Sequence, residues 1–340
     1  MKYIVIGEPC IDLIHKPDGA VIQSYGGILY SIISLAVLCR PDDIVKPIMN
    51  LGEDEFENIS DLLKQYPNID LNGIKKVNHP TRKVNLFYTN YRSGLSARFE
   101  TSTKPTYPIS FEEIIDLTIS SDFNEVDGIL VNMISGVDIT LNTMLKVRQF
   151  FNSYIHLDIH NLVMKTNSDG TRVHTNLKNW QLWCLCANTV QMNEYEVKSL
   201  SKTKRTEYEV LEELLINSEK NLKKLFHFKE EESSEKFDLS KISLEGVIIT
   251  RGNNGVSGYQ KKIKNYAGKI FTDLDKHEVR AIENPNIKDT TGCGDVFASA
   301  FMLNYSRSKD FIKSLYFANR IASYKTSFEG IQELYKLKDN

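Results

Sequence analysis

The chain has 340 residues, of which 41% are hydrophobic and 25% are charged, as is ordinary for a soluble globular protein of one large domain or two. Its formal net charge is −2, whereas general nucleic-acid binders usually carry a basic excess, and no apolar run approaches the roughly 20 residues that span a bilayer. We therefore expect no nucleic-acid partner and no membrane partner. The five scattered cysteines lack the spacing of a disulfide framework, which favours reduced thiols and a cytoplasmic location.

Buried strands and helices alternate along most of the chain. Residues 2–7 form a β-branched run that ends in a glycine, which is typical of a buried parallel strand. Similar patterns predict strands at 43–52, 127–135, 154–161 and 246–250, and helices at about 28–39, 139–152, 206–228 and 308–326. This alternation predicts an α/β fold with a mostly parallel central sheet and helices on both faces.

Two segments with alternating polarity, near 18–25 and 82–100, interrupt this order. The second is centred on a Ser93–Gly94 turn, and both predict strands of a small separate sheet. Exposed edges of such a sheet need covering, so we expect a homodimer that pairs two of these sheets. The Ser/Glu-rich stretch at 226–241 is expected to be a solvated insertion.

His156, Asp158 and His160 would share one face of a regular strand, which superficially resembles a metal cluster. No other His or Asp group in the sequence completes the set with metal-type spacing. We therefore expect no transition-metal site at this strand, and interpret Asp158 as a strand-end residue.

The stretch DTTGCGDVFASAFM, residues 289–302, combines a glycine-rich turn with the start of a helix. The first N–H groups of a helix lack intrahelical partners and carry partial positive charge, so they can bind an anion that glycines allow to approach. Asp295 would repel that anion unless the carboxylate has a chemical role, such as taking a proton from a hydroxyl nucleophile. The alternative interpretation is a capped core helix after a turn.

At these residues the chain resembles the ribokinase/PfkB family of carbohydrate and nucleoside kinases, whose signature is approximately D-T-x-G-A-G-D. The matching residues are Asp289, Thr290, Gly292, Gly294 and Asp295, and Cys293 stands where alanine is common. The resemblance implies that Asp295 is the general base. It also implies that the backbone N–H groups of residues 292–295, including Cys293, form an anion hole for the transferred phosphoryl group.

The same resemblance implies a sugar site near the N-terminus. Asp12 matches an aspartate that holds substrate hydroxyls, and Gly26 and Gly27 match a pair whose backbone approaches the sugar. The family usually has an asparagine where this chain has Ser31, a shorter side chain that can still bond a hydroxyl. Ser31 therefore leaves the identity of the sugar open.

A nucleotide and a magnesium ion are implied by further matches in the C-terminal half. Glu196, in an N-x-x-E motif that starts at Asn193, would organise Mg²⁺ and its waters, since magnesium takes few protein carboxylates. The residues expected beside the nucleotide are Asn193, Thr250, Gly252, Gly255, Ala318, Asn319 and Ala322.

The resemblance covers nearly the whole chain and implies one ribokinase-like domain, residues 1–340, with a β-sheet lid formed by about 12–25 and 81–104. The implied activity is an ATP-dependent sugar kinase whose partners are ATP and a small-molecule sugar. Its cofactors would be ATP and Mg²⁺, together with a monovalent cation such as K⁺, which family members often bind near the anion hole through backbone carbonyls.

Several alternatives stay open. A nucleoside acceptor would want an aromatic stacking partner such as Tyr25 or Tyr30. A sugar acid such as 2-keto-3-deoxygluconate would want a lid arginine, from the set Arg82, Arg92 and Arg98. A catalytically silent sugar- or nucleotide-binding regulator, and more distantly a nicotinamide-dependent oxidoreductase, are the other candidates, although no G-x-G-x-x-G follows a strand.

Overall fold

The computed structural model describes residues 1–16, 18–89, 97–119, 123, 125–202, 206–218, 222, 237–266 and 269–339. Its largest element is a nine-stranded sheet. In spatial order the strands are β15 (Lys269–Val279), β14 (Val256–Tyr266), β13 (Gly246–Thr250), β12 (Thr189–Asn193), β9 (Tyr154–Asp158), β8 (Gly128–Asn132), β1 (Lys2–Ile6), β4 (Ile44–Gly52) and β5 (Ile74–Val77). The strands from β13 to β5 pair in parallel, and β14 and β15 add antiparallel neighbours at one edge, which confirms the predicted sheet.

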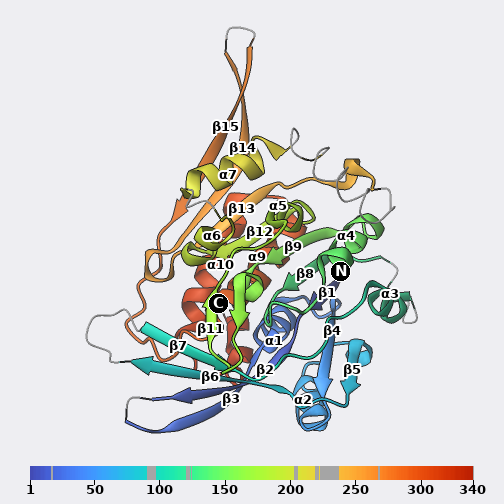
Figure 1. Ribbon diagram of the computed structural model, residues 1–340, viewed down its shortest axis with the longest axis vertical. Helices are drawn as coiled ribbons and strands as arrows, with labels where there is room; N and C mark the ends of the chain where they lie inside the picture. Colours follow the sequence, from blue (N-terminus) through green and yellow to red (C-terminus); the bar gives the residue numbers. More distant parts are fainter. Residues whose placement is uncertain are drawn as a thin grey trace.

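Helices cover both faces of this sheet, as predicted (Figure 1). The buried side chains of β1 show why, because Tyr3 and Val5 join one apolar core and Ile4 and Ile6 join the other. On the Tyr3 side lie α1 (Ile28–Leu38), α2 (Phe56–Leu63), α9 (Cys293–Ser308) and α10 (Phe311–Lys325). On the Ile4 side lie α3 (Phe111–Ile119), α4 (Leu141–Phe150), α5 (Trp180–Leu185), α6 (Glu194–Ser199) and α7 (Glu207–Leu215).

A four-stranded sheet forms from two excursions out of the main domain, as the alternating segments predicted. Its spatial order is β3 (Val21–Gly27), β2 (Pro9–His15), β6 (Arg82–Thr89) and β7 (Ala97–Ser102). We call these four strands the lid sheet. It crosses the end of the molecule opposite the projecting β14–β15 ribbon (Figure 1). The predicted turn at Ser93–Gly94 lies outside the described residues, and so do residues 226–236 of the insertion expected at 226–241. Of its last residues, Leu239–Lys241 form a 3₁₀ turn.

The β7 edge of the lid sheet is partly covered from within the chain. Thr101 bridges to Thr171, in the turn of a hairpin formed by β10 (Met164–Thr166) and β11 (Arg172–His174). The Ser102 backbone N–H donates to the Gly170 carbonyl at 2.9 Å. The homodimer stays a prediction.

The strand expected over 154–161 is shorter than predicted. It ends at Asp158, and His160 opens the 3₁₀ turn η2 (His160–Val163) with a positive φ of 39°. His156, Asp158 and His160 therefore do not share a strand face. Among the described residues, no group of three His, Cys, Asp or Glu side chains could hold a metal ion, and no helix combines the length and apolar character needed to cross a bilayer. The remaining 3₁₀ turns are η1 (Leu71–Gly73), η3 (Leu239–Lys241), η4 (Gly252–Asn254) and η5 (Leu334–Asp339).

Candidate active site

The turn before α9 depends on a glycine. Gly292 is the N-cap of the helix and has a φ of 75°, a conformation that L side chains rarely adopt. A Cβ on Gly292 would also lie 2.4 Å from the ring of Tyr30, whereas a Cβ on Gly294 would meet no atom within 4 Å. Gly292 is therefore needed for the turn, and Gly294 leaves open space at the helix start.

Two cavities meet at this helix start, and both are lined by Thr290, Cys293 and Gly294. One, of about 230 Å³, lies toward the lid sheet and is called the lid-side cavity. The other, of about 240 Å³, lies toward β13 and α10 and is called the α10-side cavity. Asp295 lines only the lid-side cavity. The N-terminus of α9 thus stands where molecules in the two cavities would touch.

Asp12, Gly27 and Asp295, for which the sequence analysis expects roles in acceptor binding and proton transfer, line the lid-side cavity together. Position 26 needs a glycine because a Cβ there would lie 2.0 Å from Asp12 Oδ2, in the space that the Asp12 carboxyl group occupies. Gly27 has a φ of 62° and a Cβ there would lie 2.6 Å from the Glu8 carbonyl oxygen. Gly26 does not line the cavity itself but leaves room for the carboxylate that does.

Asp295 is buried in the first turn of α9 and accepts a hydrogen bond from Asn132 Nδ2 at 2.7 Å. Burial raises the pKa of Asp295 to about 7, and the hydrogen bond from Asn132 opposes that rise while the charge of Asp12 adds to it. A carboxyl that titrates near neutral pH is suited to general-base chemistry. Asn132 was not predicted from the sequence, although a polar residue that ends the buried run of β8 was a usable signal.

Ser31 lies beneath the lid-side cavity and does not line it. Its side chain is fully buried, its Oγ donates to the Asp295 carbonyl oxygen at 3.4 Å, and it accepts from Asn132 Nδ2 at 3.3 Å. The expected contact between Ser31 and a substrate hydroxyl is therefore replaced by support of Asp295 and Asn132.

Glu196 belongs to a capping box at the start of α6. Its two carboxylate oxygens accept from the backbone N–H and the side-chain amide of Asn193, at 2.7 and 2.6 Å. Burial raises the pKa of Glu196 well above its ordinary range, and the charge of Asp295 contributes. Burial also raises the pKa of Asp158, with help from the charges of Glu196 and Asp295. These carboxyl groups do not form a three-ligand metal group among the described residues, but an oxygen of buried Glu196 fits a magnesium ion that keeps most of its water, and such an ion would relieve the repulsion.

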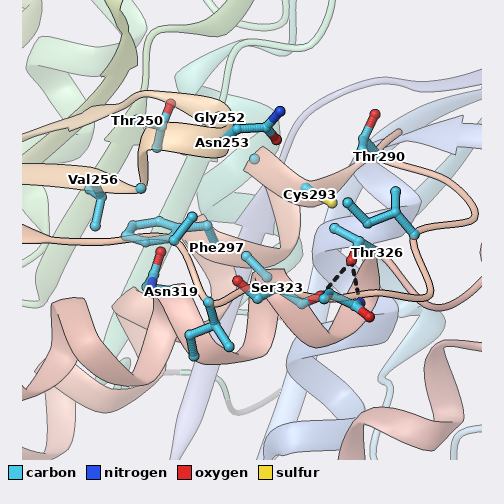
Figure 2. Close-up of a pocket in the computed structure, with 17 residues that line it drawn as sticks. Thr250, Gly252, Asn253, Val256, Thr290, Cys293, Phe297, Asn319, Ser323 and Thr326 are labelled. Atoms are coloured by element: carbon cyan, nitrogen blue, oxygen red, sulfur yellow. Dashed lines mark hydrogen bonds between the residues drawn. The ribbon is translucent and has the colours of Figure 1, made fainter. Parts of the chain in front are cut away.

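The α10-side cavity lies between the loop after β13 and the helices α9 and α10 (Figure 2). Five of the residues expected beside a nucleotide line this cavity, Thr250, Gly252 and Gly255 from the loop and Asn319 and Ala322 from α10. Apolar walls are added by Val256, Ala281, Ile282, Ile287 and Phe297.

Two of the residues predicted beside a nucleotide lie elsewhere. Ala318 is fully buried in the core and does not line the α10-side cavity. Asn193 lines the lid-side cavity. The Asn319 side chain is held in place because its amide donates to the Arg280 carbonyl oxygen at 2.9 Å.

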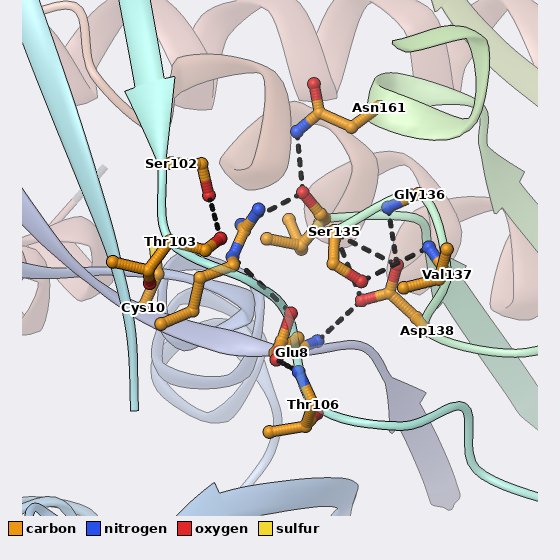
Figure 3. A network of polar contacts seen from close by, with 12 residues as sticks. Glu8, Cys10, Ser102, Thr103, Thr106, Ser135, Gly136, Val137, Asp138 and Asn161 are labelled. Carbon is orange, nitrogen blue, oxygen red and sulfur yellow. Dashed lines mark hydrogen bonds and ion pairs between the residues drawn. The ribbon is translucent and has the colours of Figure 1, made fainter. Parts of the chain in front are cut away.

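Two buried arginines line the lid-side cavity, and each has a carboxylate partner. Arg82 lies 3.4 Å from Glu8 and also donates to the Ile134 carbonyl oxygen at 3.1 Å, within a network that reaches Asp138 (Figure 3). Arg172 lies 3.4 Å from Glu100. The side chains of Arg92 and Arg98 lie outside the described part of the chain.

The two tyrosines proposed to stack on a base are both engaged by the protein. Tyr30 lines the lid-side cavity but is 1% exposed, and its ring packs between Gly292 and the Lys325 ammonium, which lies 5.2 Å from the ring centroid. The Tyr25 hydroxyl donates to Glu55 at 2.8 Å, and Tyr25 is not part of either cavity wall.

Comparison with known proteins agrees with this architecture. The pfkB family carbohydrate kinase model matches residues 178–336. Ribokinase from Giardia lamblia superposes with a TM-score of 0.69 at 15% identity, with 100% of this chain and 99% of that chain covered. Ribokinase from Thermotoga maritima gives 0.64 at 17%, with 100% and 98% covered. A pyrophosphate-dependent kinase in the ribokinase family gives 0.66 at 13%, with 99% of each chain covered.

A search of curated protein sequences gives no match. At the identities of the solved structures, the likeness shows a shared fold over the full length of the chain. The signature at residues 289–295 lies within the segment that the family model matches. Residues 178–336 thus match the pfkB family carbohydrate kinase model, and the chain as a whole has a ribokinase-like fold.

Proposed function

We propose that this chain is an ATP-dependent kinase that transfers the γ-phosphoryl group to a hydroxyl of a neutral sugar or sugar-like polyol. The observation that carries the proposal is the meeting of two cavities at the N-terminus of α9, with the carboxyl of Asp295 on the lid side only. The acceptor would occupy the lid-side cavity and the nucleotide the α10-side cavity. Their reacting groups would then meet at Gly294.

In the proposed reaction, Asp295 takes the proton of the acceptor hydroxyl as its oxygen attacks the γ-phosphorus. The bond between that phosphorus and the bridging oxygen of ADP breaks, and ADP leaves with the electron pair. Backbone N–H groups at the start of α9 would stabilise the charge on the transferred group. The Cys293 N–H already donates to the Thr290 carbonyl oxygen at 3.3 Å, so Gly294 and Asp295 would provide the better-directed donors.

Glu196 would hold magnesium, partly through water, as the fit of its buried carboxylate supports. Magnesium, when bound, neutralises phosphate charge. Asp12 and Gly27 would orient the acceptor, since a carboxylate can accept hydrogen bonds from two neighbouring hydroxyls.

The walls of the α10-side cavity favour an adenine nucleotide as the donor. Phe297 and its aliphatic neighbours form an apolar surface, which a purine can cover and which inorganic pyrophosphate cannot use. A similar solved structure is nevertheless a pyrophosphate-dependent kinase, so pyrophosphate is the second candidate donor.

The charge balance of the lid-side cavity favours a neutral acceptor over a sugar acid. Arg82 and Arg172 are paired with Glu8 and Glu100, so an acceptor carboxylate would compete with carboxylates already in place. A nucleoside is disfavoured because the Tyr30 ring is covered and Tyr25 points into a contact with Glu55.

The test is ADP release from Mg-ATP with pentoses, hexoses, cyclic polyols, sugar acids, sugar phosphates and nucleosides, with phosphate release from pyrophosphate measured in parallel. We expect a response to one class of neutral polyols, lost in Asp295→Asn while ATP binding is retained. Asp54→Asn is the matched control, because Asp54 bonds Thr81 outside both cavities. Silence across the panel with ATP still bound would favour the regulatory binding protein, and an Asp295→Asn variant that keeps its turnover would refute the assigned base.

A further inference from the structure

Lys325, the last residue of α10, places a fully buried ammonium directly behind the turn that precedes α9. Its Nζ donates to Asp289 Oδ2 at 3.0 Å and to the Asp289 carbonyl oxygen at 3.2 Å. Burying a charge is costly unless it is paired and hydrogen-bonded, so a buried lysine at this point needs a reason beyond packing.

Asp289 connects this ammonium to the helix start. Its Oδ1 accepts from the Thr291 N–H at 2.8 Å, and its Oδ2 also accepts from the Gly330 N–H at 3.2 Å. The carboxylate therefore fixes the turn that carries Gly292. The carboxyl end of α10 adds partial negative charge that further favours the ammonium.

The charge of Lys325 affects the ionisation of residues at the start of α9. Burial raises the pKa of Asp295 to about 7 and that of Cys293 to about 12, and in both cases the Lys325 ammonium opposes the rise. At Asp289 the ammonium and the hydrogen bonds from Thr291 together outweigh the effect of burial and lower the pKa of that carboxyl. A fixed positive charge at this place would also stabilise negative charge on a phosphoryl group at the start of α9.

The family resemblance implies a monovalent cation held near the anion hole by backbone carbonyl oxygens. The residues beside Asp289 do not fit such an ion, because the carbonyl and carboxylate oxygens of Asp289 already bond an ammonium, which has the same charge and a similar size to K⁺. We propose that Lys325 takes the place of the monovalent cation, so that phosphoryl transfer by this chain does not require K⁺. Lys325 is in this sense a positioning residue, and the proposal rests on the proposed kinase function.

The test compares turnover in KCl, NH₄Cl and tetramethylammonium chloride at one ionic strength. We expect the wild type to differ by less than about twofold between salts, because its cation is covalently attached. Lys325→Ala should lose at least about tenfold in tetramethylammonium and recover with K⁺ or NH₄⁺ along a saturable curve.

Lys46→Ala is the matched control. Lys46 is also fully buried and also bonds one carboxylate and one backbone carbonyl oxygen, Asp70 Oδ2 at 2.9 Å and the Leu117 oxygen at 3.0 Å, but it lies outside both cavities. The Lys46→Ala variant should be less stable than the wild type, but its turnover should be the same in all three salts. A wild type that K⁺ activates several-fold, or a Lys325→Ala variant with full turnover in tetramethylammonium, would overturn the proposal.

A second readout does not depend on turnover. The melting temperature of Lys325→Ala should rise with K⁺ or NH₄⁺ relative to tetramethylammonium, since an ion that binds only the folded state stabilises it, while the wild type and Lys46→Ala should not respond. Equal responses of all three proteins would overturn the replacement of the cation by Lys325. A wild type without turnover on any acceptor would instead refute the kinase function and leave this readout intact.

Discussion

Asn132→Leu tests whether Asp295 is the base whose ionisation limits the reaction. The substitution keeps the branched arrangement of the side-chain heavy atoms, although leucine is the bulkier residue, and removes the hydrogen bond that Asn132 Nδ2 donates to the Asp295 carboxylate at 2.7 Å. A hydrogen bond to a charged group contributes about 1.5–3 kcal/mol, and one pH unit corresponds to about 1.4 kcal/mol. The pKa of Asp295, about 7 in the wild type, should therefore rise by roughly one to two pH units.

The assay is the pH dependence of kcat/KM for the acceptor, which reports the free enzyme. The wild type should lose activity below about pH 7, and Asn132→Leu should show the same loss at a higher pH, with activity recovering above about pH 9. Asn50→Leu is the control, since Asn50 is another buried asparagine near a strand end, bonded to the Tyr107 carbonyl oxygen at 3.0 Å outside both cavities. If kcat/KM falls at the same pH in Asn132→Leu as in the wild type, the reasoning is refuted. It is also refuted if Asn50→Leu shifts this pH as much as Asn132→Leu does.

Three further predictions concern the turn before α9, the buried carboxyl groups and the α10-side cavity. Gly292→Ala should lower the melting temperature more than Gly19→Ala, because both glycines have a positive φ but only Gly292 also faces a ring at 2.4 Å; equal effects would mean that the Tyr30 contact is relieved at no cost. Without magnesium, thermal stability should fall as pH rises from about 5 to 8, because buried Asp295 and Glu196 hold protons that the unfolded chain has lost, and Asp295→Asn should flatten this decline. Ala322→Phe should fill part of the α10-side cavity and raise the KM for ATP about tenfold or more with little change in the KM for the acceptor; a selective effect on the acceptor would exchange the roles of the two cavities.

The sequence predicted the layers of the fold because hydrophobic periodicity depends on local positions. The buried run of β1 and the alternating strands β3 and β6 could be recognised without knowing their partners. Motif spacing likewise placed Asp12 and Asp295 in one cavity, although they lie far apart in the chain. A motif fixes the position of a residue but not the direction of its side chain, and Ser31 and Ala318 therefore proved to lie behind the cavity walls.

Pairs of distant residues escaped prediction. Asn132 reaches Asp295 across 163 positions, and Lys325 reaches Asp289 across 36. Arg82 was considered as a ligand for a substrate carboxylate, but Glu8 already supplies its partner. A local signal such as the position of Asn132 at the end of the buried run of β8 does not identify the partner, because the contact arises only when the central sheet brings the strand ends together.

The burial of Asp295 explains how a carboxyl group can lie beside a site that binds an anion. A fully ionised carboxylate in the first turn of α9 would oppose the phosphate that the helix start attracts. With its pKa raised to about 7, the carboxyl carries less negative charge at neutral pH than an ordinary aspartate, so the average repulsion is reduced while a basic form is still present. Asn132 keeps the pKa from rising further, and the Lys325 ammonium acts in the same direction. The site thus balances attraction of the donor against basicity toward the acceptor, and either substitution, Asn132→Leu or Lys325→Ala, should shift that balance toward the protonated, inactive form.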